Sequence, residues 1–460
     1  MNKILVLFFF LSMLVSTFAS CENIGNKDMG GNNISDNNGN NNGGEGGLPT
    51  GNPPESVHKL VPFGHESVSE GLVYTVNEDG ESYSVAGIGS CTDSYIVIPS
   101  TYDGLPVVAV SEYAFESVDF EGIRLPDGML TIDEGAFVNC RSLLTVYLPE
   151  SLESIGYNAF FNCTKLIEVI NHSSLNISGF YGIRSENIKF LHKDATKIMI
   201  DDAGYLFSKI DGNNYVIGST SSEHFLVLPS SCEGEKYDIY NFAFMRSQNI
   251  VTVVIPDCVE TIHSNAFFDC YNLVSVRLGK GVKTIQDDAF FACNKIYEII
   301  NDSELHITFD NASDFGTISS NHDVLIHTGE SKIVKNGEYL FTRISNKACI
   351  IGYLGNDTEV TLPADFNGES YDIAGFAFFL EEFTHVVIPE GVSSIGDYAF
   401  NMCQDLISVT IPESVEYVGS AVFGICYNLT IRCEAKSQPE GWHELWNSSD
   451  RPVEWDCGKE

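Results

Sequence analysis

Six cysteines occupy one position of a recurring pattern, and cysteine is the residue type here that is best suited to chemistry. In each copy a Phe, usually preceded by Ala, is followed after two residues by Cys. A thiolate can act as a nucleophile or bind a metal ion. The six are Cys140, Cys163, Cys270, Cys293, Cys403 and Cys426.

Spacing and neighbouring residues argue against both kinds of chemistry. No pair of cysteines forms C-x-x-C, and no His accompanies them as in a zinc knuckle. The eleven His are dispersed, and G-x-S-x-G, H-E-x-x-H and phosphate-loop motifs are absent from the sequence. We therefore predict no catalytic residues, no metal and no cofactor. Buried free thiols acting as small apolar groups are the main prediction, and disulfides between neighbouring repeats are the alternative.

The cysteine pattern is part of a longer repeat. The stretch LLTVYLPESLESIGYNAFFNC (143–163) contains L-x-x-V-x-L-P, then L-x-x-I-G, then A-F-x-x-C, and LISVTIPESVEYVGSAVFGIC (406–426) repeats it. Alternating apolar residues predict a short strand that ends at Pro. The Ala-Phe pair is expected to begin a short helical or irregular segment. Because one coil cannot bury its own apolar residues, 22–23-residue coils must stack into a solenoid.

The period, the Pro, the Ile-Gly and the Ala-Phe together resemble the BspA-like leucine-rich repeat family of bacterial and protist surface proteins. The resemblance covers roughly residues 70–435. It implies a mainly β solenoid whose L-x-x-V-x-I-P strands line one curved face. It also implies adhesion as the function.

A larger period divides the solenoid into three tandem sub-solenoids. Ala-Phe pairs that begin at residues 114, 243 and 377 each follow a hairpin-like segment. The predicted blocks are 56–170, 171–300 with a connector and 301–432 with a connector, followed by a Trp-rich cap at 433–460. The Trp residues could instead form a sugar-binding platform. Cys433 and Cys457 bracket the cap and are the preferred disulfide in an oxidising compartment.

The N-terminus reads as an export signal. One positive charge, the apolar run ILVLFFFLSMLV and small residues before Cys21 are typical of a secretory signal peptide. Ala19-Ser20-Cys21 resembles a bacterial lipobox, which implies that residues 1–20 are removed and that Cys21 carries a lipid. An ordinary signal peptide is the alternative. Residues 21–55 are rich in Asn and Gly and are expected to form a flexible tether.

The charge excludes one class of partner. The formal net charge is −38, and the 25 Lys and Arg residues are scattered. Nucleic-acid binding needs a basic footprint, so we predict no nucleic-acid partner. The expected contact with a membrane is through the N-terminal lipid alone.

The candidate binding face is the outward position x of V-x-I-P, where a solenoid offers a large surface. The two functions left open are adhesion to a host-matrix protein, mucin or another surface macromolecule, and a scaffold role in the cell envelope. Both place the protein outside the cell, anchored to a membrane. The candidate face residues are Arg124, Tyr147, Val254, Arg277, Val387 and Thr410.

Overall fold

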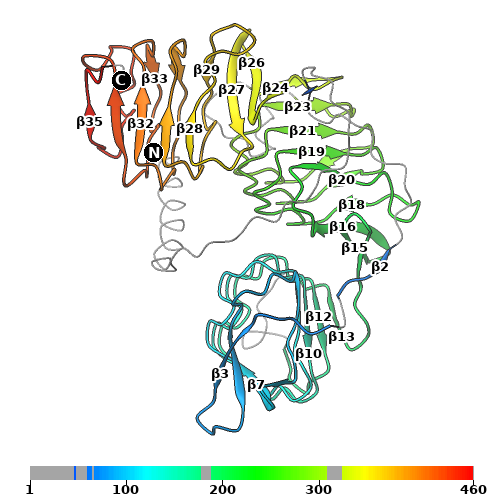
Figure 1. Cartoon of the computed structure of the whole chain (residues 1–460). Helices are drawn as coiled ribbons and strands as arrows, with labels where there is room; N and C mark the ends of the chain where they lie inside the picture. Colours follow the sequence, from blue (N-terminus) through cyan, green and yellow to red (C-terminus); the bar gives the residue numbers. More distant parts are fainter. Residues whose placement is uncertain (1–45, 48–59, 65–66, 178–187, 308–323, 459–460) are drawn as a thin grey trace, which may run out of the picture. The chain divides into compact units, whose positions relative to one another are not determined.

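The computed structural model describes residues 46–47, 60–64, 67–177, 188–307 and 324–458 (Figure 1). All regular elements within these ranges are β-strands. The predicted β solenoid is confirmed, whereas the predicted short helical segments are wrong. No helix suited to crossing a membrane occurs among the residues described.

The first block winds between two sheets. Its front sheet is parallel and has the order β13-β12-β10-β8-β5, and its back sheet has the order β11-β9-β7-β4-β3 with β6 paired to β7. The front strands are β5 (Tyr95–Val97), β8 (Gly122–Arg124), β10 (Thr145–Leu148), β12 (Glu168–Asn171) and β13 (Phe190–His192). The back strands are β3 (Val73–Val76), β4 (Tyr83–Gly87), β6 (Thr101–Tyr102), β7 (Leu105–Val110), β9 (Thr131–Ile132) and β11 (Ser154–Ile155).

The second block repeats this plan and adds two antiparallel strands to its back sheet. The front strands are β17 (Phe225–Val227), β19 (Thr252–Ile255), β21 (Ser275–Leu278), β23 (Glu298–Asn301) and β24 (Leu325–His327). The back strands are β2 (Val61–Pro62), β14 (Ile198–Ile200), β15 (Tyr205–Ile210), β16 (Asn213–Ser219), β18 (Asp238–Ile239), β20 (Thr261–Ile262) and β22 (Thr284–Ile285).

The third block has the same back-sheet plan as the second. Its front strands are β28 (Glu359–Thr361), β30 (His385–Val387), β32 (Ser408–Ile411), β34 (Thr430–Cys433) and β35 (Val453–Glu454). Its back strands are β1 (Gly46–Gly47), β25 (Val334–Asn336), β26 (Tyr339–Ile344), β27 (Lys347–Tyr353), β29 (Asp372–Ile373), β31 (Ser394–Ile395) and β33 (Tyr417–Val418).

The block boundaries differ from those expected at residues 170 and 300. Strand β13 still pairs with β12, and β24 still pairs with β23. The first block therefore extends to His192 and the second to His327. The front and back ladders of one block do not continue into those of the next.

The Ala-Phe segments form a ladder of turns. Some of their backbone N–H groups donate within their own coil, and others donate to a carbonyl of the next coil. In one coil Asn265 and Asp269 have φ angles of 59° and 58°, a left-handed conformation that interrupts a helix after one turn. The Phe267 N–H donates to the Ala289 carbonyl of the next coil at 2.7 Å. The Phe268 N–H donates within its own coil to the Asn265 carbonyl at 3.1 Å. Backbone bonds between coils thus replace those of a helix.

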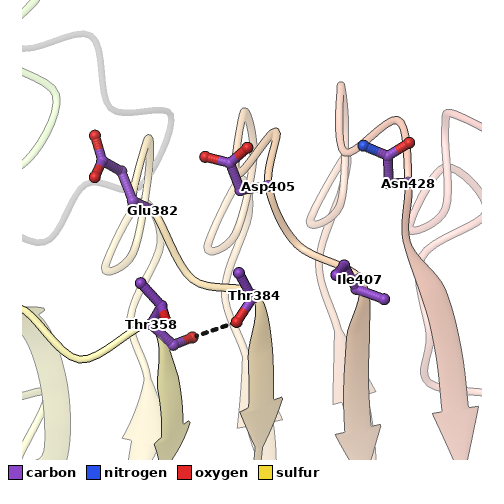
Figure 2. A pocket seen from close by; sticks show the side chains of 6 residues that line it. All are labelled: Thr358, Glu382, Thr384, Asp405, Ile407 and Asn428. Atoms are coloured by element: carbon purple, nitrogen blue, oxygen red, sulfur yellow. Dashed lines mark hydrogen bonds between the residues drawn. The ribbon is translucent and has the colours of Figure 1, made fainter. Parts of the chain in front are cut away.

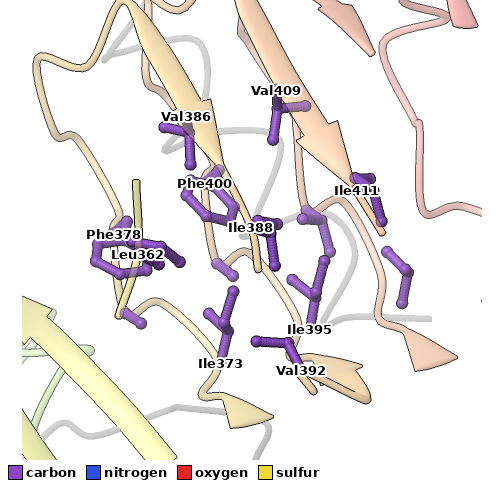
Figure 3. Packing of buried hydrophobic residues seen from close by; sticks show 14 of the residues in the cluster. Leu362, Ile373, Phe378, Val386, Ile388, Val392, Ile395, Phe400, Val409 and Ile411 are labelled. Carbon is purple, nitrogen blue, oxygen red and sulfur yellow. The ribbon is translucent and has the colours of Figure 1, made fainter. Parts of the chain in front are cut away.

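Stacked phenylalanines fill the core beside this ladder. Phe244 and Phe267 have ring centroids 5.0 Å apart, and Phe267 and Phe290 have theirs 4.9 Å apart with an interplanar angle of 1°. Each block has its own cluster of buried apolar side chains, and Figure 3 shows part of the cluster in the third block. Trp442 and Trp446, each 5% exposed, belong to that third cluster and cover the last coil.

The six repeat cysteines are free and buried, as expected for packed thiols. Each Sγ atom also lies 2.9–3.1 Å from the carbonyl oxygen of the Phe in the preceding coil. A thiol is a weak donor, so Cys both fills a small gap and donates to that carbonyl. This contact gives a reason for Cys in place of Ala or Val.

Thiol accessibility tests this packing. Burial raises the pKa of Cys163 and of Cys426 to about 12, and it disfavours the thiolate that reacts with disulfide reagents. Among the described cysteines of the native protein at pH 8, we expect rapid labelling by an aromatic disulfide reagent only at the partly exposed Cys91 and Cys457. Burial raises the pKa of the third partly exposed cysteine, Cys258, to about 11, so Cys258 should label slowly.

Denaturation without reductant is the control, and it should release all twelve described thiols, or ten where the predicted Cys433–Cys457 disulfide has formed. Rapid native labelling of any repeat cysteine would contradict the packing. Missing thiols in the denatured protein would instead reveal disulfides.

Candidate binding surface

The predicted face residues lie in three pairs on three separate front sheets. Each is the third residue of its strand. The neighbouring strands place Tyr147 opposite Arg124, Arg277 opposite Val254, and Thr410 opposite Val387. The six residues therefore do not form one continuous ladder.

The environments of the three pairs differ. The Arg124 guanidinium lies 4.5 Å from the centroid of the Tyr147 ring, within the range of a cation–π contact. Arg277 pairs with Asp302 and donates to the Gly329 carbonyl at 2.6 Å, so its donors are partly engaged within the chain.

Two valines of the predicted face have opposite exposure. The expectation that Val254 is exposed is wrong, because only 5% of its surface is accessible. Val387 is 41% exposed. The third block therefore offers the apolar contact that the second block lacks at this position.

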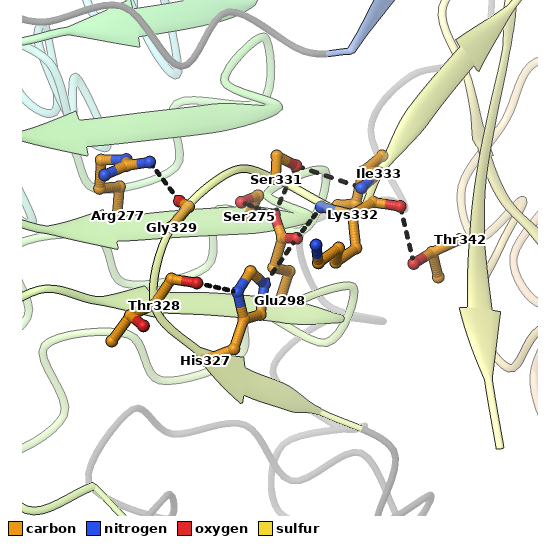
Figure 4. A network of polar contacts seen from close by, with 10 residues as sticks. All are labelled: Ser275, Arg277, Glu298, His327, Thr328, Gly329, Ser331, Lys332, Ile333 and Thr342. Atoms are coloured by element: carbon orange, nitrogen blue, oxygen red, sulfur yellow. Dashed lines mark hydrogen bonds and ion pairs between the residues drawn. The ribbon is translucent and has the colours of Figure 1, made fainter. Parts of the chain in front are cut away.

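The first residues of the front strands explain why the front sheets of the three blocks differ in exposure. In the first two blocks this row is buried at Thr145, Glu168, Ser275 and Glu298. Figure 4 shows the cause at Glu298, whose carboxylate accepts hydrogen bonds from Ser275 Oγ at 2.7 Å and from Ser331 Oγ at 2.7 Å. Ser331 belongs to the connector between the second and third blocks. This connector therefore contacts the front sheet of the second block.

The connector is fixed by further contacts to the same carboxylate. The Lys332 N–H lies 2.5 Å and His327 Nε2 lies 3.1 Å from Glu298 Oε1. The first block repeats the arrangement at Glu168, which contacts Thr145, His192, Thr196 and Lys197. A buried carboxylate needs such partners, so these contacts hold both connectors against their front sheets.

A second row is also covered in the first two blocks. This side row consists of the residue immediately before each front strand. Leu144 and Ile167 form an apolar cluster with Leu206 and Ile217 of the second block's hairpin. The cluster between the second and third blocks contains Val251, Val274, Tyr297, Leu340 and Ile351.

Polar contacts accompany each joint between blocks. Lys165 Nζ donates to the Ala243 carbonyl at 3.1 Å, and Lys295 Nζ lies 3.3 Å from Glu381 Oε1. The Tyr297 hydroxyl donates to the Gly375 carbonyl. Apolar burial and these contacts together close the side rows of the first two blocks.

The third block leaves both rows accessible. Its first-residue row contains Glu359 and His385, whose side chains are 77% and 45% exposed. We define the third-block face by its exposed or half-buried outward side chains. These are Glu359, Thr361, His385, Val387, Ser408, Thr410 and Arg432.

A groove of about 450 Å³ borders this face, and Figure 2 shows the six residues along it. Thr358, Thr384 and Ile407 come from the side row, and Ile407 is 49% exposed. We call this the end groove. Its remaining lining residues are Glu382, Asp405 and Asn428.

The third-block face combines ionisable side chains with an exposed apolar side chain. His385 Nδ1 lies 3.8 Å from Glu359 Oε1, and Arg432 Nε lies 3.3 Å from Glu454 Oε2. Val387 lies two residues after His385 on the same strand, and Thr410 separates it from Arg432. No metal-binding cluster of His, Cys, Asp and Glu occurs in the described part of the chain.

The remaining predicted sites concern cysteines. Cys433 and Cys457 are free thiols in the structure, although the Cys457 N–H donates to the Cys433 carbonyl at 3.0 Å. The disulfide between them stays a prediction. Cys21, the predicted site of lipid attachment, lies outside the described residues.

Sequence reasoning missed the first-residue row and the end groove. A signal was present, because connectors follow the first two blocks whereas the Trp-rich segment follows the third. Burial of the corresponding rows by those connectors requires contacts between residues far apart in the sequence.

The repeat, its two-sheet coils and its turn ladder define a leucine-rich-repeat solenoid. The model of the BspA type leucine rich repeat region matches residues 94–203, 237–351 and 368–437, which is more than half of the chain. The chain belongs to this family. No curated protein matches it.

Several solved structures match parts of this chain. The leucine-rich repeat protein of T. pallidum is 24% identical, over 52% of this chain and 84% of its own, with a TM-score of 0.21. A leucine rich cell surface protein of Faecalibacterium prausnitzii is 17% identical, over 86% and 96%, with a TM-score of 0.26. The pneumococcal vaccine antigen PcpA is 15% identical, over 88% and 100%, with a TM-score of 0.20.

A half-buried acid on the side row of the first block gives a prediction about stability. Glu121 occupies the side-row position that Val251 occupies in the second block. Burial raises the pKa of Glu121 from 4.5 to about 8, against the opposing effect of Lys165. The folded state thus keeps a proton that the unfolded state loses. The contribution of this group to stability therefore falls as the pH rises from about 4.5 to about 8.

Because a Gln side chain does not titrate, we expect the Glu121→Gln variant to lack this loss of stability with rising pH. Calorimetry should show a melting temperature similar to wild type at pH 4 and higher by about 2–4 °C at pH 8. Glu150→Gln, at an exposed position, is the matched control and should show no such difference. A difference that does not change with pH would contradict the assignment.

Proposed function

We propose that this leucine-rich-repeat protein is anchored at the cell surface and binds a macromolecule through the third-block face. The single observation that carries the proposal is that connectors cover the front-sheet row in the first two blocks and leave it accessible in the third. The exposed Val387 among hydroxyl and charged groups provides an apolar centre with a polar rim.

The proposed ligand is a host-matrix protein, a mucin or another surface macromolecule. A curved parallel sheet suits an extended partner better than a small molecule. The negative net charge of −38 does not suit nucleic acid. The alternative is a scaffold role in the cell envelope, which the repetitive structure also suits.

Binding measurements on the chain from residue 22 onward test the proposal. We expect Val387→Glu to weaken binding to the recognised matrix protein or mucin by at least about tenfold, because it buries a carboxylate in the contact. The matched control is Leu191→Glu, at a 51% exposed position on the closing front strand of the first block. Surface plasmon resonance against a panel of matrix proteins and mucins is the measurement.

The outcomes separate the two functions. Equal weakening by both variants would place the contact elsewhere. Absence of binding across the panel, together with co-purification of envelope proteins, would favour the scaffold role.

The anchoring part of the proposal has its own test. Cys21→Ala removes the thiol that would carry the lipid, so the protein should move from the membrane fraction to the soluble fraction. Metabolic labelling with a fatty acid should be lost in parallel. Retention of Cys21→Ala in the membrane fraction would contradict lipid anchoring through this residue.

A further inference from the structure

The same joint is made twice within the chain. In both cases side-row residues of one block pack against the hairpin of the next. The hairpins correspond closely, since β15 and β26 carry a bulge at Leu206/Phe207 and at Leu340/Phe341. Leu206 and Leu340 are 0% and 1% exposed.

The third block presents the side-row half of this joint, and no hairpin among the described residues covers it. Thr384 and Ile407 stand at the positions of Val251 and Val274, as the parallel register of the front strands requires. Between the second and third blocks, Leu340 and its neighbours fill the joint and leave about 150 Å³. The corresponding end groove has about 450 Å³.

The first block presents the hairpin half. Its strands β3 and β4 carry the same bulge, at Val73/Tyr74, and Val73 pairs with Gly87 as Leu206 pairs with Gly218. Val73 is 47% exposed, in contrast to the buried Leu206. The first block thus carries the hairpin part of the joint and the third block carries the side-row part. Among the residues described, the first block has no counterpart of the strands β14 and β25 that flank the later hairpins, near Ile198 and Ile333 of the two clusters.

We propose that the hairpin of the first block of one copy docks into the end groove of a second copy, with Val73 against Ile407. The interface is heterologous, because each copy uses one surface at each end. Such contacts propagate into open chains or close into rings. This self-association is separate from ligand binding at the third-block face.

The proposed contact is weaker than the joints within the chain. The end groove has no counterpart of Tyr297, because Leu429 is the recurring core Leu of its coil and Thr430 directly begins the next strand. It also has Asn428 at the position of Lys295. Within the chain, the covalent connection supplies a high effective concentration, which separate copies lack. Crowding of copies on a cell surface would raise their local concentration and compensate for the missing covalent connection.

Charge predicts how salt affects the contact. Glu382 and Asp405 line the groove at the positions of Asn249 and Asn272, which face residues 353–356 in the second joint. The corresponding first-block segment, Ile88–Cys91, has no charged side chain. The general repulsion between copies of charge −38 remains, so added salt should strengthen association.

Sedimentation velocity of the chain from residue 22 onward tests the contact. With rising concentration up to about 1 mM, the upper range of weak affinities, wild type should form dimers and larger species, more so at high salt. Val73→Glu alone and Ile407→Glu alone should each stay monomeric. Leu191→Glu is the matched exposed control and should associate like wild type.

Mixing the two variants is the decisive measurement. Val73→Glu retains the groove and Ile407→Glu retains the hairpin, so an equimolar mixture should form dimers of twice the monomer mass and nothing larger. Circular dichroism melts that match wild type would show that both variants fold. Monomeric wild type at about 1 mM, or a mixture that stays monomeric, would overturn the proposal. Ligand binding tested at Val387 would be unaffected by either result.

Discussion

The structure depends on the pairing of each coil with its neighbours. A single coil exposes its Phe ring, the backbone donors of its turns and its strand edges. Stacking satisfies all three at once, through rings about 5 Å apart, hydrogen bonds such as Phe267 N–H to the Ala289 carbonyl, and parallel ladders. The free thiol of the repeat cysteine adds a contact to the Phe carbonyl of the preceding coil. A recurring cysteine therefore has a structural explanation in this chain.

The need to cover apolar surface also governs the ends of each block. The first two blocks bury their side rows against the following hairpin, and a buried Glu holds each connector on the front sheet. The last coil is covered by Trp442 and Trp446. Because no hairpin in the described part of the chain packs on the third block's side row, its end groove and neighbouring face are accessible there. The surfaces proposed for binding arise from this difference between otherwise similar blocks.

Much of the fold could be predicted from local pattern. The alternation in L-x-x-V-x-L-P predicted the front strands, and the Ala-Phe spacing predicted the coils and their grouping into three. The prediction of short helical segments was wrong because residues such as Asn265 and Asp269 adopt left-handed angles that direct donors to the next coil. Among the candidate face residues, Val387 was placed on an exposed surface correctly and Val254 was not.

The sequence by itself determined the coil, its period and the residues that point inward, because these follow from side-chain alternation and from the chain's need to bury Leu, Val, Ile and Phe. Only the tertiary structure decided which outward side chains remain accessible. Thr145 and Ser408 hold equivalent positions in their coils, yet the first is fully buried and the second is half-buried. Accessibility depends on connectors and hairpins that return from distant parts of the chain, and a repeat motif does not encode that information.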